Sequence, residues 1–536
     1  MRAEPRRPLM GHRSKATSFP VQGRLGTPGQ HPNLALLVVV VGVLITAIDT
    51  TIVVLALPEI QRSLHIGLAS VIWVIISYLL IITLLSTQVG RLGDMFGRVR
   101  MYEAGFVVFI VGSAACALAW NELSLVVFRL AQGVGGALIT ANSGAVIADT
   151  FPKEQRGRAY GFNSIGFNTG AVLGVVLGGV IVTYVSWRWI FWINVPIGIG
   201  AVVVAKRVLL DRGGRERRRL DWWGMVTLGL GLFGLLWAMV KLTSEPLDLQ
   251  VSAFFVGGLI TLLVFWWIER STSEPMLELK LFGVPTMTPS LLAAMFQSLA
   301  NFAVLFLLLM YLQGVRQLSP IHASLLLVPG YVVGGVVGPF AGRFADRRSA
   351  VVPATVGLGI QVLALLVYAH LGLRTSLWVV VVAYMVGAVG AGCFFPSNNS
   401  AVMKAAPGKE FGIASGLLRT FANVGMVFSF ALAILVASAS ITKHEAFAIF
   451  VGTSTLSRSA ATAFTDGIHS AFYSSTSLMV VAAILSAMRA RSGRAGRAVA
   501  KTGPEQVPNM QSSSSSSLTP AESRRRQLRR TGQDVG

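Results

Sequence analysis

Long apolar runs, separated by short polar pieces, occupy most of residues 34–488. A helix needs roughly 20 apolar residues to cross about 30 Å of hydrocarbon, and most of these runs approach or exceed that length. The pattern therefore predicts an all-α polytopic membrane protein with fourteen transmembrane helices. The expected spans lie near residues 34–57, 70–88, 103–120, 123–147, 160–185, 189–205, 222–240, 250–268, 287–311, 320–341, 351–371, 377–400, 411–437 and 470–488.

Lysine and arginine are distributed unevenly between the two sides of the membrane, as the fourteen predicted spans assign the loops to them. With the N-terminus inside, 36 of the 45 basic residues fall in cytoplasmic pieces. Seven fall in outer loops, namely Arg62, Arg188, Lys241, Arg316, Arg374, Lys443 and Arg458. Cytoplasmic loops carry the excess of positive charge in membrane proteins. We therefore expect both termini in the cytoplasm and a multi-pass protein of the inner or plasma membrane.

The net charge of +22 alone would also fit a nucleic-acid-binding protein. The excess follows the cytoplasmic pieces, however, and includes the polar ends at residues 1–32 and 489–536. Basic segments beside a span attract anionic lipids. We expect disordered cytosolic ends, contact with anionic membrane lipids, no nucleic-acid partner and a monomeric protein.

Composition also limits the chemistry. The chain is 53% hydrophobic and 13% charged, whereas about a quarter of the residues of a soluble domain are charged. Cys116 and Cys393 lie in separate apolar runs, so we expect no disulfide, no metal site and no cofactor. The sequence contains no Gly-x-x-x-x-Gly-Lys-Ser/Thr loop. These features argue against an ATP-driven pump and against an enzyme.

A short motif occurs twice at equivalent places. Gly90, Arg91 and Asp94 lie between the second and third spans, and the same residue types recur 252 positions later, between the tenth and eleventh. One copy alone would be an ordinary charged turn, but two copies indicate two related six-helix bundles. We expect these turns to form a gate network of charged bridges between helix ends. Its members are Gly90, Arg91, Asp94, Gly97, Arg98, Gly342, Arg343, Asp346 and Arg347.

The repeat predicts the organisation of the chain. A disordered arm covers residues 1–32 and an N-terminal six-helix bundle covers residues 33–205. A basic loop with two inserted helices follows at residues 206–268. The C-terminal six-helix bundle covers residues 269–488, and a disordered basic tail covers residues 489–536.

Further motifs follow in order along the chain. The first span contains Asp49-Thr50-Thr51-Ile52-Val53-Val54-Leu55-Ala56-Leu57-Pro58, and the fourth contains Arg129-Leu130-Ala131-Gln132-Gly133. Trp187-Arg188-Trp189-Ile190-Phe191-Trp192-Ile193-Asn194-Val195-Pro196-Ile197-Gly198 begins before the sixth span. Together with the repeated turn, this set resembles the major facilitator superfamily and, within it, the fourteen-span drug:proton antiporter family of multidrug efflux transporters. The resemblance implies the major facilitator fold and a substrate cavity between two bundles.

Two ionisable residues lie inside predicted spans at similar depth. Asp49 lies roughly 22 Å from the cytoplasmic face and Arg129 roughly 21 Å, at 1.5 Å per residue. Such residues are costly in a membrane and usually functional. The resemblance implies that the first and fourth helices line the cavity. We therefore predict that Asp49 exchanges the proton and also faces a cationic substrate, with Arg129 as its partner. The alternatives left open are a structural Asp49 beside a helix break and a packing or gate salt bridge for Arg129.

Glycines recur every four residues in the fifth span, as Gly166, Gly170, Gly174 and Gly178, and Gly179 follows. Small residues at this spacing form a smooth ridge that lets helices pack closely. Two roles are open for this glycine ridge: helix packing alone, or packing that also seals the cavity against proton leak. The family pattern has a proline where this span has Val175.

Other single residues are more ambiguous. Trp73 and Tyr78 in the second span are candidate cavity aromatics for cation–π contact with a drug, or else interfacial tryptophan and tyrosine. Arg419 in the thirteenth span also departs from the family pattern and has no explanation at this level.

The sequence thus favours a proton-coupled antiporter that exports drug-like, cationic or lipophilic organic molecules. One alternative is an exporter of an endogenous lipid or secreted metabolite. Another, from a different class, is a membrane scaffold or signalling protein that acts through its tails.

Overall fold

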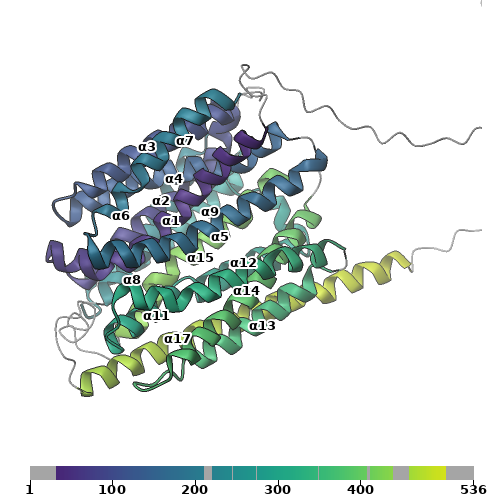
Figure 1. The fold of residues 1–536 in the computed structure, drawn as a ribbon. Coiled ribbons are helices and arrows are strands. Elements are labelled where there is room, and N and C mark those ends of the chain that lie inside the picture. Colours follow the sequence, from purple (N-terminus) through teal and green to yellow (C-terminus); the bar gives the residue numbers. More distant parts are fainter. Residues whose placement is uncertain are drawn as a thin grey trace, which may run out of the picture. The chain divides into compact units, whose positions relative to one another are not determined.

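The computed structural model describes residues 32–151, 153–210, 220–243, 245–272, 274–347, 349–406, 411–438 and 458–501. Every regular element in these ranges is helical. Fourteen of the helical segments are long and apolar enough to cross a membrane, and Figure 1 shows them packed side by side. The all-α class and the fourteen predicted spans are therefore confirmed. Most of the predicted N-terminal arm and most of the tail lie outside the described residues.

The N-terminal half supplies the first six spans. They are α1 (Pro32–Leu64), α2 (Leu68–Phe96), α3 (Arg98–Ala117), α4 (Glu122–Thr150), α5 (Lys153–Tyr184) and a sixth span divided into α6 (Trp189–Trp192) and α7 (Asn194–Val208). Within this half, α1 packs on α5, while α2 and α3 both pack on α4.

The C-terminal half repeats this arrangement. It contains η1 (Leu279–Gly283), α10 (Met287–Asn301), α11 (Val304–Met310), the π-helical η2 (Tyr311–Val315), α12 (Pro320–Arg347), α13 (Val351–Tyr368), α14 (Leu377–Ala405), α15 (Phe411–Ser438) and α17 (Arg458–Lys501). Here α10 packs on α15, while α12 and α13 pack on α14. The ninth span consists of α10, α11 and η2. The same pairs of helices thus meet in both halves, which is how the sequence repeat appears in three dimensions.

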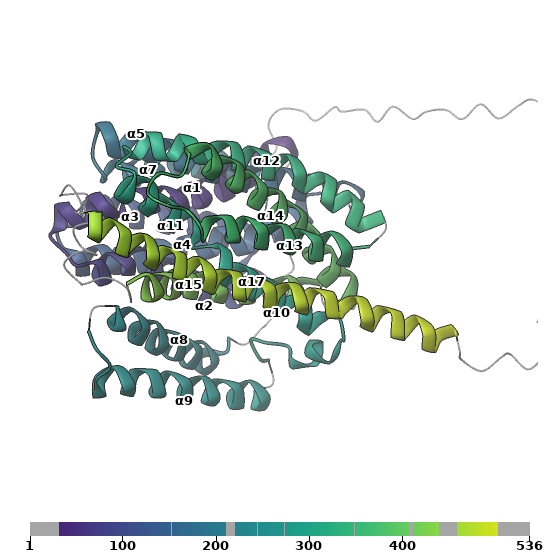
Figure 2. The same ribbon diagram turned by 90° about the horizontal axis from the view of Figure 1, so that it is seen from below.

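The seam between the halves has the same symmetry. The second helix of each half packs on the fifth helix of the other, so α2 meets α15 and α5 meets α12. The inserted helices are α8 (Trp222–Leu242) and α9 (Leu249–Ser271). Figure 2 shows this pair lying beside the rest of the bundle. Among the described residues of this pair, those of α8 pack closely on the two halves, on both α2 and α15, so α8 covers that seam from outside.

Short polar caps define where several helices begin. The Asn121 side chain accepts from the Ser124 N–H at 2.8 Å, and the Ser124 hydroxyl accepts in return from the Asn121 N–H. The Asp221 side chain accepts from the Gly224 N–H at the start of α8, and Asp248 accepts from the Val251 N–H at the start of α9. Such caps satisfy N–H groups that the first turn of a helix leaves free. Each inserted helix therefore has its start fixed by its own sequence.

The two repeated turns are more helical than the sequence suggests. Helix α2 continues through Phe96, and only Gly97, with φ of 104°, separates it from Arg98 at the start of α3. A positive φ is tolerated by glycine at little cost. The second copy, from Gly342 to Arg347, forms the last turns of α12. Both motifs, which the sequence predicts as loops, therefore lie at helix ends. In the first copy, Gly97 alone provides the turn between the two helices.

The last helix also differs from its prediction. Helix α17 extends to Lys501, past residue 489, where the sequence predicts the start of a disordered tail. Residues 491–536 form a unit separate from residues 1–490, and only the end of α17 is described there.

The glycine ridge of α5 lies against α1. A Cβ atom on Gly170 would lie 2.5 Å from the Leu44 carbonyl oxygen, and one on Gly174 would lie 2.7 Å from that of Ile48. Both distances are shorter than side chains tolerate. The ridge therefore brings the two backbones together, as the packing interpretation predicts.

Candidate functional site

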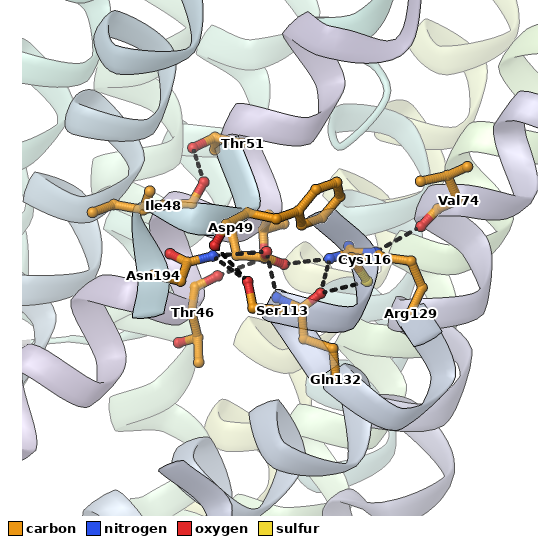
Figure 3. A network of polar contacts seen from close by, with 12 residues as sticks. Thr46, Ile48, Asp49, Thr51, Val74, Ser113, Cys116, Arg129, Gln132 and Asn194 are labelled. Carbon is orange, nitrogen blue, oxygen red and sulfur yellow. Dashed lines mark hydrogen bonds and ion pairs between the residues drawn. The ribbon is translucent and has the colours of Figure 1, made fainter. Parts of the chain in front are cut away.

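Asp49 and Arg129 are in direct contact. Arg129 Nη1 donates to Asp49 Oδ2 at 2.7 Å, and the side chains are 0% and 1% exposed. Asp49 comes from α1 and Arg129 from α4, and their contact shows that the two side chains lie at the same depth in the bundle. Figure 3 shows the pair at the centre of a polar network. Placing two charges in such surroundings costs several kcal/mol each, which close geometry and further hydrogen bonds offset.

Three neutral side chains extend the network around the Asp49 carboxylate. Gln132 Nε2 donates to Asp49 Oδ1 at 2.8 Å, and Asn194 Nδ2 donates to the same oxygen at 3.4 Å. Asn194 also donates to Ser113 Oγ at 3.1 Å. The Asp49 carboxylate therefore accepts hydrogen bonds from three residues, Arg129 included, which suits its ionised form.

Arg129 has partners on its other side as well. Its Nε donates to the Val74 carbonyl oxygen at 2.9 Å, and Nη1 donates to Gln132 Oε1 at 2.7 Å. The guanidinium carbon lies 4.1 Å from the ring centroid of Tyr78 and 5.7 Å from that of Phe191. A desolvated cation over an aromatic face is stabilised by about 2 kcal/mol. Backbone, amide, carboxylate and aromatic groups thus hold the guanidinium in one orientation.

All of these groups belong to the N-terminal half. They come from α1, α2, α3, α4, α6 and α7, so the network lies inside that bundle rather than on the seam between the halves. Asp49 has no exposed surface in this structure. The prediction that Asp49 faces a cationic substrate therefore does not hold for this arrangement, because protein donors already occupy its carboxylate.

The two candidate cavity aromatics have other positions. Tyr78 is buried and stacks on Arg129. Trp73 packs on Phe233 of the inserted helix α8, with ring centroids 5.5 Å apart. Trp73 also lines a surface hollow of about 330 Å³ with residues 121–123 of the N-terminal half. In this structure Tyr78 thus contacts the arginine and Trp73 contacts the inserted pair, and a cavity role for either side chain stays a prediction.

The first copy of the gate motif forms an ion-pair network. Arg98 donates to Asp94 Oδ1 from Nη2 at 2.9 Å and to Asp149 Oδ1 from Nη1 at 2.8 Å. These bridges join the ends of α2, α3 and α4. The three side chains are between 24% and 31% exposed, so solvent weakens each attraction only in part.

Arg91 links this helix end to the beginning of the C-terminal half. It donates to the carbonyl oxygens of Glu274 and Pro275. The next residues of that segment are held by Glu269 at the end of α9, which accepts from the N–H groups of Met276 and Leu277 at 3.1 and 2.9 Å. The segment is thus fixed from both the N-terminal half and the inserted pair.

The second copy has weaker contacts. Asp346 accepts from the Ser400 hydroxyl at 2.8 Å, and Lys404 donates to the carbonyl oxygens of Ala345 and Asp346. Arg343 and Arg347 are exposed, and within the described ranges neither forms a salt bridge. The two copies correspond in position but differ in their bonding.

The sequence alone predicts no individual role for Gln132, Asn194 or Arg489. Gln132 lies three residues after Arg129, on the same helical face, and Asn194 belongs to the sixth-span motif, so both signals were present. Arg489 was counted with the tail. It is instead 1% exposed within the C-terminal half, donating to Asn398 Oδ1 at 2.6 Å and Ser290 Oγ at 3.0 Å.

Two related bundles joined along a symmetric seam, with a buried ion pair inside one bundle, define a polytopic membrane transporter. The chain matches the Major Facilitator Superfamily over residues 39–430 and belongs to that superfamily. It is therefore a transporter of this superfamily and not an enzyme.

Two curated relatives are similar over most of the chain. The tetracenomycin C resistance and export protein of Streptomyces glaucescens is 31% identical over 417 residues, which cover 76% of this chain and 75% of the relative. The multidrug resistance protein Stp of Mycobacterium tuberculosis is 30% identical over 401 residues, 74% of each chain.

Among solved structures, a bacterial homologue of the human lysosomal transporter Spinster, inward-facing and unoccupied, matches with a TM-score of 0.61 and 16% identity. The match covers 86% of this chain and 97% of the other. At this identity the likeness concerns the fold alone.

Proposed function

We propose that this protein is a proton-driven antiporter that exports drug-like organic molecules across the cell membrane by alternating access. The observation that carries the proposal is the buried Asp49–Arg129 ion pair, because ionisable groups inside a membrane bundle are costly and usually mark ion or proton pathways. The names of the two relatives, which refer to drug resistance and export, support the direction of transport and the class of substrate.

In this proposal Asp49 binds and releases the proton. Its ionised form suits the three donors around it. Protonation removes the attraction to Arg129 and turns one acceptor oxygen into a donor, so the network has to rearrange. Helix α1, which carries Asp49, packs on α5, and α5 packs on α12 across the seam. A rearrangement around Asp49 thereby changes how the two halves fit together, which couples proton binding to substrate access.

Charge asymmetry supports an orientation. The excess of lysine and arginine on one side supports a cytoplasmic position for the helix ends with Arg98 and for both termini. The same excess supports contact with anionic lipids. We propose the cell membrane as the location and the monomer as the working unit.

A second substrate class has one supporting observation. The Streptomyces glaucescens relative is named for export of tetracenomycin C as well as resistance to it. Export of a metabolite made by the cell is thus the alternative to export of foreign drugs, and the same ion-pair chemistry would drive it.

Dye efflux from a host lacking its own pumps tests the proposal. Cells expressing the protein are loaded with cationic, neutral and anionic dyes, and efflux is followed before and after a protonophore collapses the proton gradient. We expect gradient-dependent efflux of at least one dye. Efflux that continues unchanged without the gradient would contradict proton coupling, and the absence of any efflux would favour the metabolite alternative, which extracts of the native host then test.

A further inference from the structure

Arg419 is an exposed arginine within a transmembrane helix. It lies eight residues after the described start of α15, roughly 12 Å along the helix. Its Nη1 donates to the Thr140 carbonyl oxygen of α4 at 2.6 Å. Since α15 packs on α2 and α8 covers that contact from outside, a side chain that reaches α4 points toward the interior of the seam. Arg419 therefore places a positive charge between the two halves.

Two buried arginines of the bundle, Arg129 and Arg489, are each held by several protein partners. Arg129 has a carboxylate, an amide and a carbonyl partner, and Arg489 has two hydroxyls, an amide and a carbonyl. Both are 1% exposed. Arg419 is exposed and makes one hydrogen bond, to Thr140, within the described ranges. A guanidinium carries five N–H donors, so most of those of Arg419 remain available to a ligand.

Polar groups adjoin Arg419 on the same seam. Asn423, one turn later on α15, donates to Ser86 Oγ of α2 at 3.1 Å. Thr420 is 4% exposed, and its hydroxyl has no partner in the described part of the chain. Thr87 of α2, which faces Gly416 of α15, likewise has a hydroxyl without a partner in this part of the chain. This stretch of the seam thus contains unsatisfied hydrogen-bonding groups next to an exposed cation, within otherwise apolar helices.

We propose that Arg419 binds an anionic group, such as a carboxylate or sulfonate, on the transported molecule, so that the substrates include amphipathic organic anions. This inference rests on the proposed export function and narrows its substrate class. The planar guanidinium fork matches the two oxygens of a carboxylate. Asp49, in contrast, is closed off inside the N-terminal half and offers a cationic substrate no contact in this arrangement. The charge that faces the seam is positive.

The test uses two dyes that share a xanthene ring system and differ in charge: carboxyfluorescein, which is anionic, and rhodamine 6G, which is cationic. Binding of each is measured on the purified full-length protein in nanodiscs of phosphatidylcholine. The variants are Arg419→Gln and Arg419→Lys. Arg374→Gln is the matched control, because Arg374 is an exposed arginine of the C-terminal half outside the helices and its replacement removes the same charge.

We expect Arg419→Gln to weaken carboxyfluorescein binding about tenfold or more, as loss of a charge-assisted hydrogen bond does. Rhodamine 6G binding should stay unchanged or become tighter. Arg419→Lys should retain part of the affinity for carboxyfluorescein, and Arg374→Gln all of it. A change in the ratio of the two dye affinities indicates that Arg419 recognises the anionic group. A purely structural role would change both affinities alike.

Several results would overturn the inference. They are failure of the wild-type protein to bind carboxyfluorescein, unchanged binding by Arg419→Gln, and equal weakening of both dyes, which a structural latch to Thr140 would give. Competition between phosphatidylglycerol and carboxyfluorescein that disappears in Arg419→Gln would assign the guanidinium to a lipid phosphate instead. Proteoliposomes with a pH gradient test the proposed function separately: binding without gradient-driven movement would reject the antiporter and leave the anion site standing.

Discussion

Arg129 Nη1 lies 2.7 Å from Asp49 Oδ2, although 80 residues separate the two in sequence and neither side chain reaches the surface. In surroundings of low dielectric such a pair is strongly coupled, so the charge state of one residue determines the position of the other. Gln132 contacts both members of the pair. The three side chains therefore form one hydrogen-bonded unit, and in the proposed function a proton on Asp49 would disturb all of it.

Replacing Asp49 by Asn should abolish uphill transport. The substitution keeps the shape but removes the titrating group and leaves Arg129 buried without a counter-charge. Loss of one partner of a buried pair costs about 3–5 kcal/mol, so thermal stability should fall as well. Gradient-driven substrate uptake into inside-out vesicles measures the first effect, and thermal unfolding of the purified protein measures the second.

A control for this experiment is Glu59→Gln. Glu59 lies on the same helix and pairs with Arg62, but its side chain is 37% exposed, so neither stability nor uptake should change by much. Downhill exchange of substrate, which needs no proton, should survive in Asp49→Asn protein that remains folded. Full uphill transport by Asp49→Asn would remove this residue from the coupling scheme.

Replacing Arg129 by Lys should be nearly as harmful as replacing it by Gln. The guanidinium donates in three directions, to Asp49, Gln132 and the Val74 carbonyl, and stacks on Tyr78. An ammonium on a flexible stem cannot reproduce that planar arrangement. Uptake assays on membranes with matched protein content would compare the two variants. Wild-type transport by Arg129→Lys would mean that charge alone matters at this position.

Replacing Gly174 by Ala should disturb the α1–α5 contact. The added Cβ would lie 2.7 Å from the Ile48 carbonyl oxygen, and overpacking of this kind costs about 1–3 kcal/mol. Gly161→Ala on the same helix is the matched control, since a Cβ there meets no atom within 4 Å. Thermal unfolding should separate the two variants, with Gly161→Ala at least as stable as the wild type. Equal stability of both variants would show that the ridge is not tightly packed.

The two copies of the gate motif should respond differently to mutation. Arg98→Gln breaks the bridges to both Asp94 and Asp149, and partly exposed pairs contribute roughly 0.2–1 kcal/mol each. Asp346→Asn keeps an oxygen for its single hydroxyl partner, Ser400. We expect a larger loss of transport and stability from the first change, measured in vesicles and by unfolding. The opposite order would place the working gate in the second copy.

Several properties follow from the sequence alone because each depends on local composition. Helices that cross hydrocarbon must be long and apolar, so all fourteen spans can be counted without knowing their neighbours. The division into two halves also follows from the sequence. The Gly90–Asp94 motif recurs with all three residue types shifted by the same number of positions, which indicates a duplicated fold. Even the shared depth of Asp49 and Arg129 follows from helical rise.

Tertiary structure decided what these residues contact. Transmembrane helices are apolar on most faces, so periodicity does not say which face meets which neighbour. The rotation of α1 and α4 turned Asp49 and Arg129 into the N-terminal bundle rather than the seam, and it stacked Tyr78 on the arginine. The packing of α15 against α2 likewise left Arg419 exposed between the halves. Burial, and therefore the role of each charge, depends on contacts between helices distant in sequence, which no local pattern encodes.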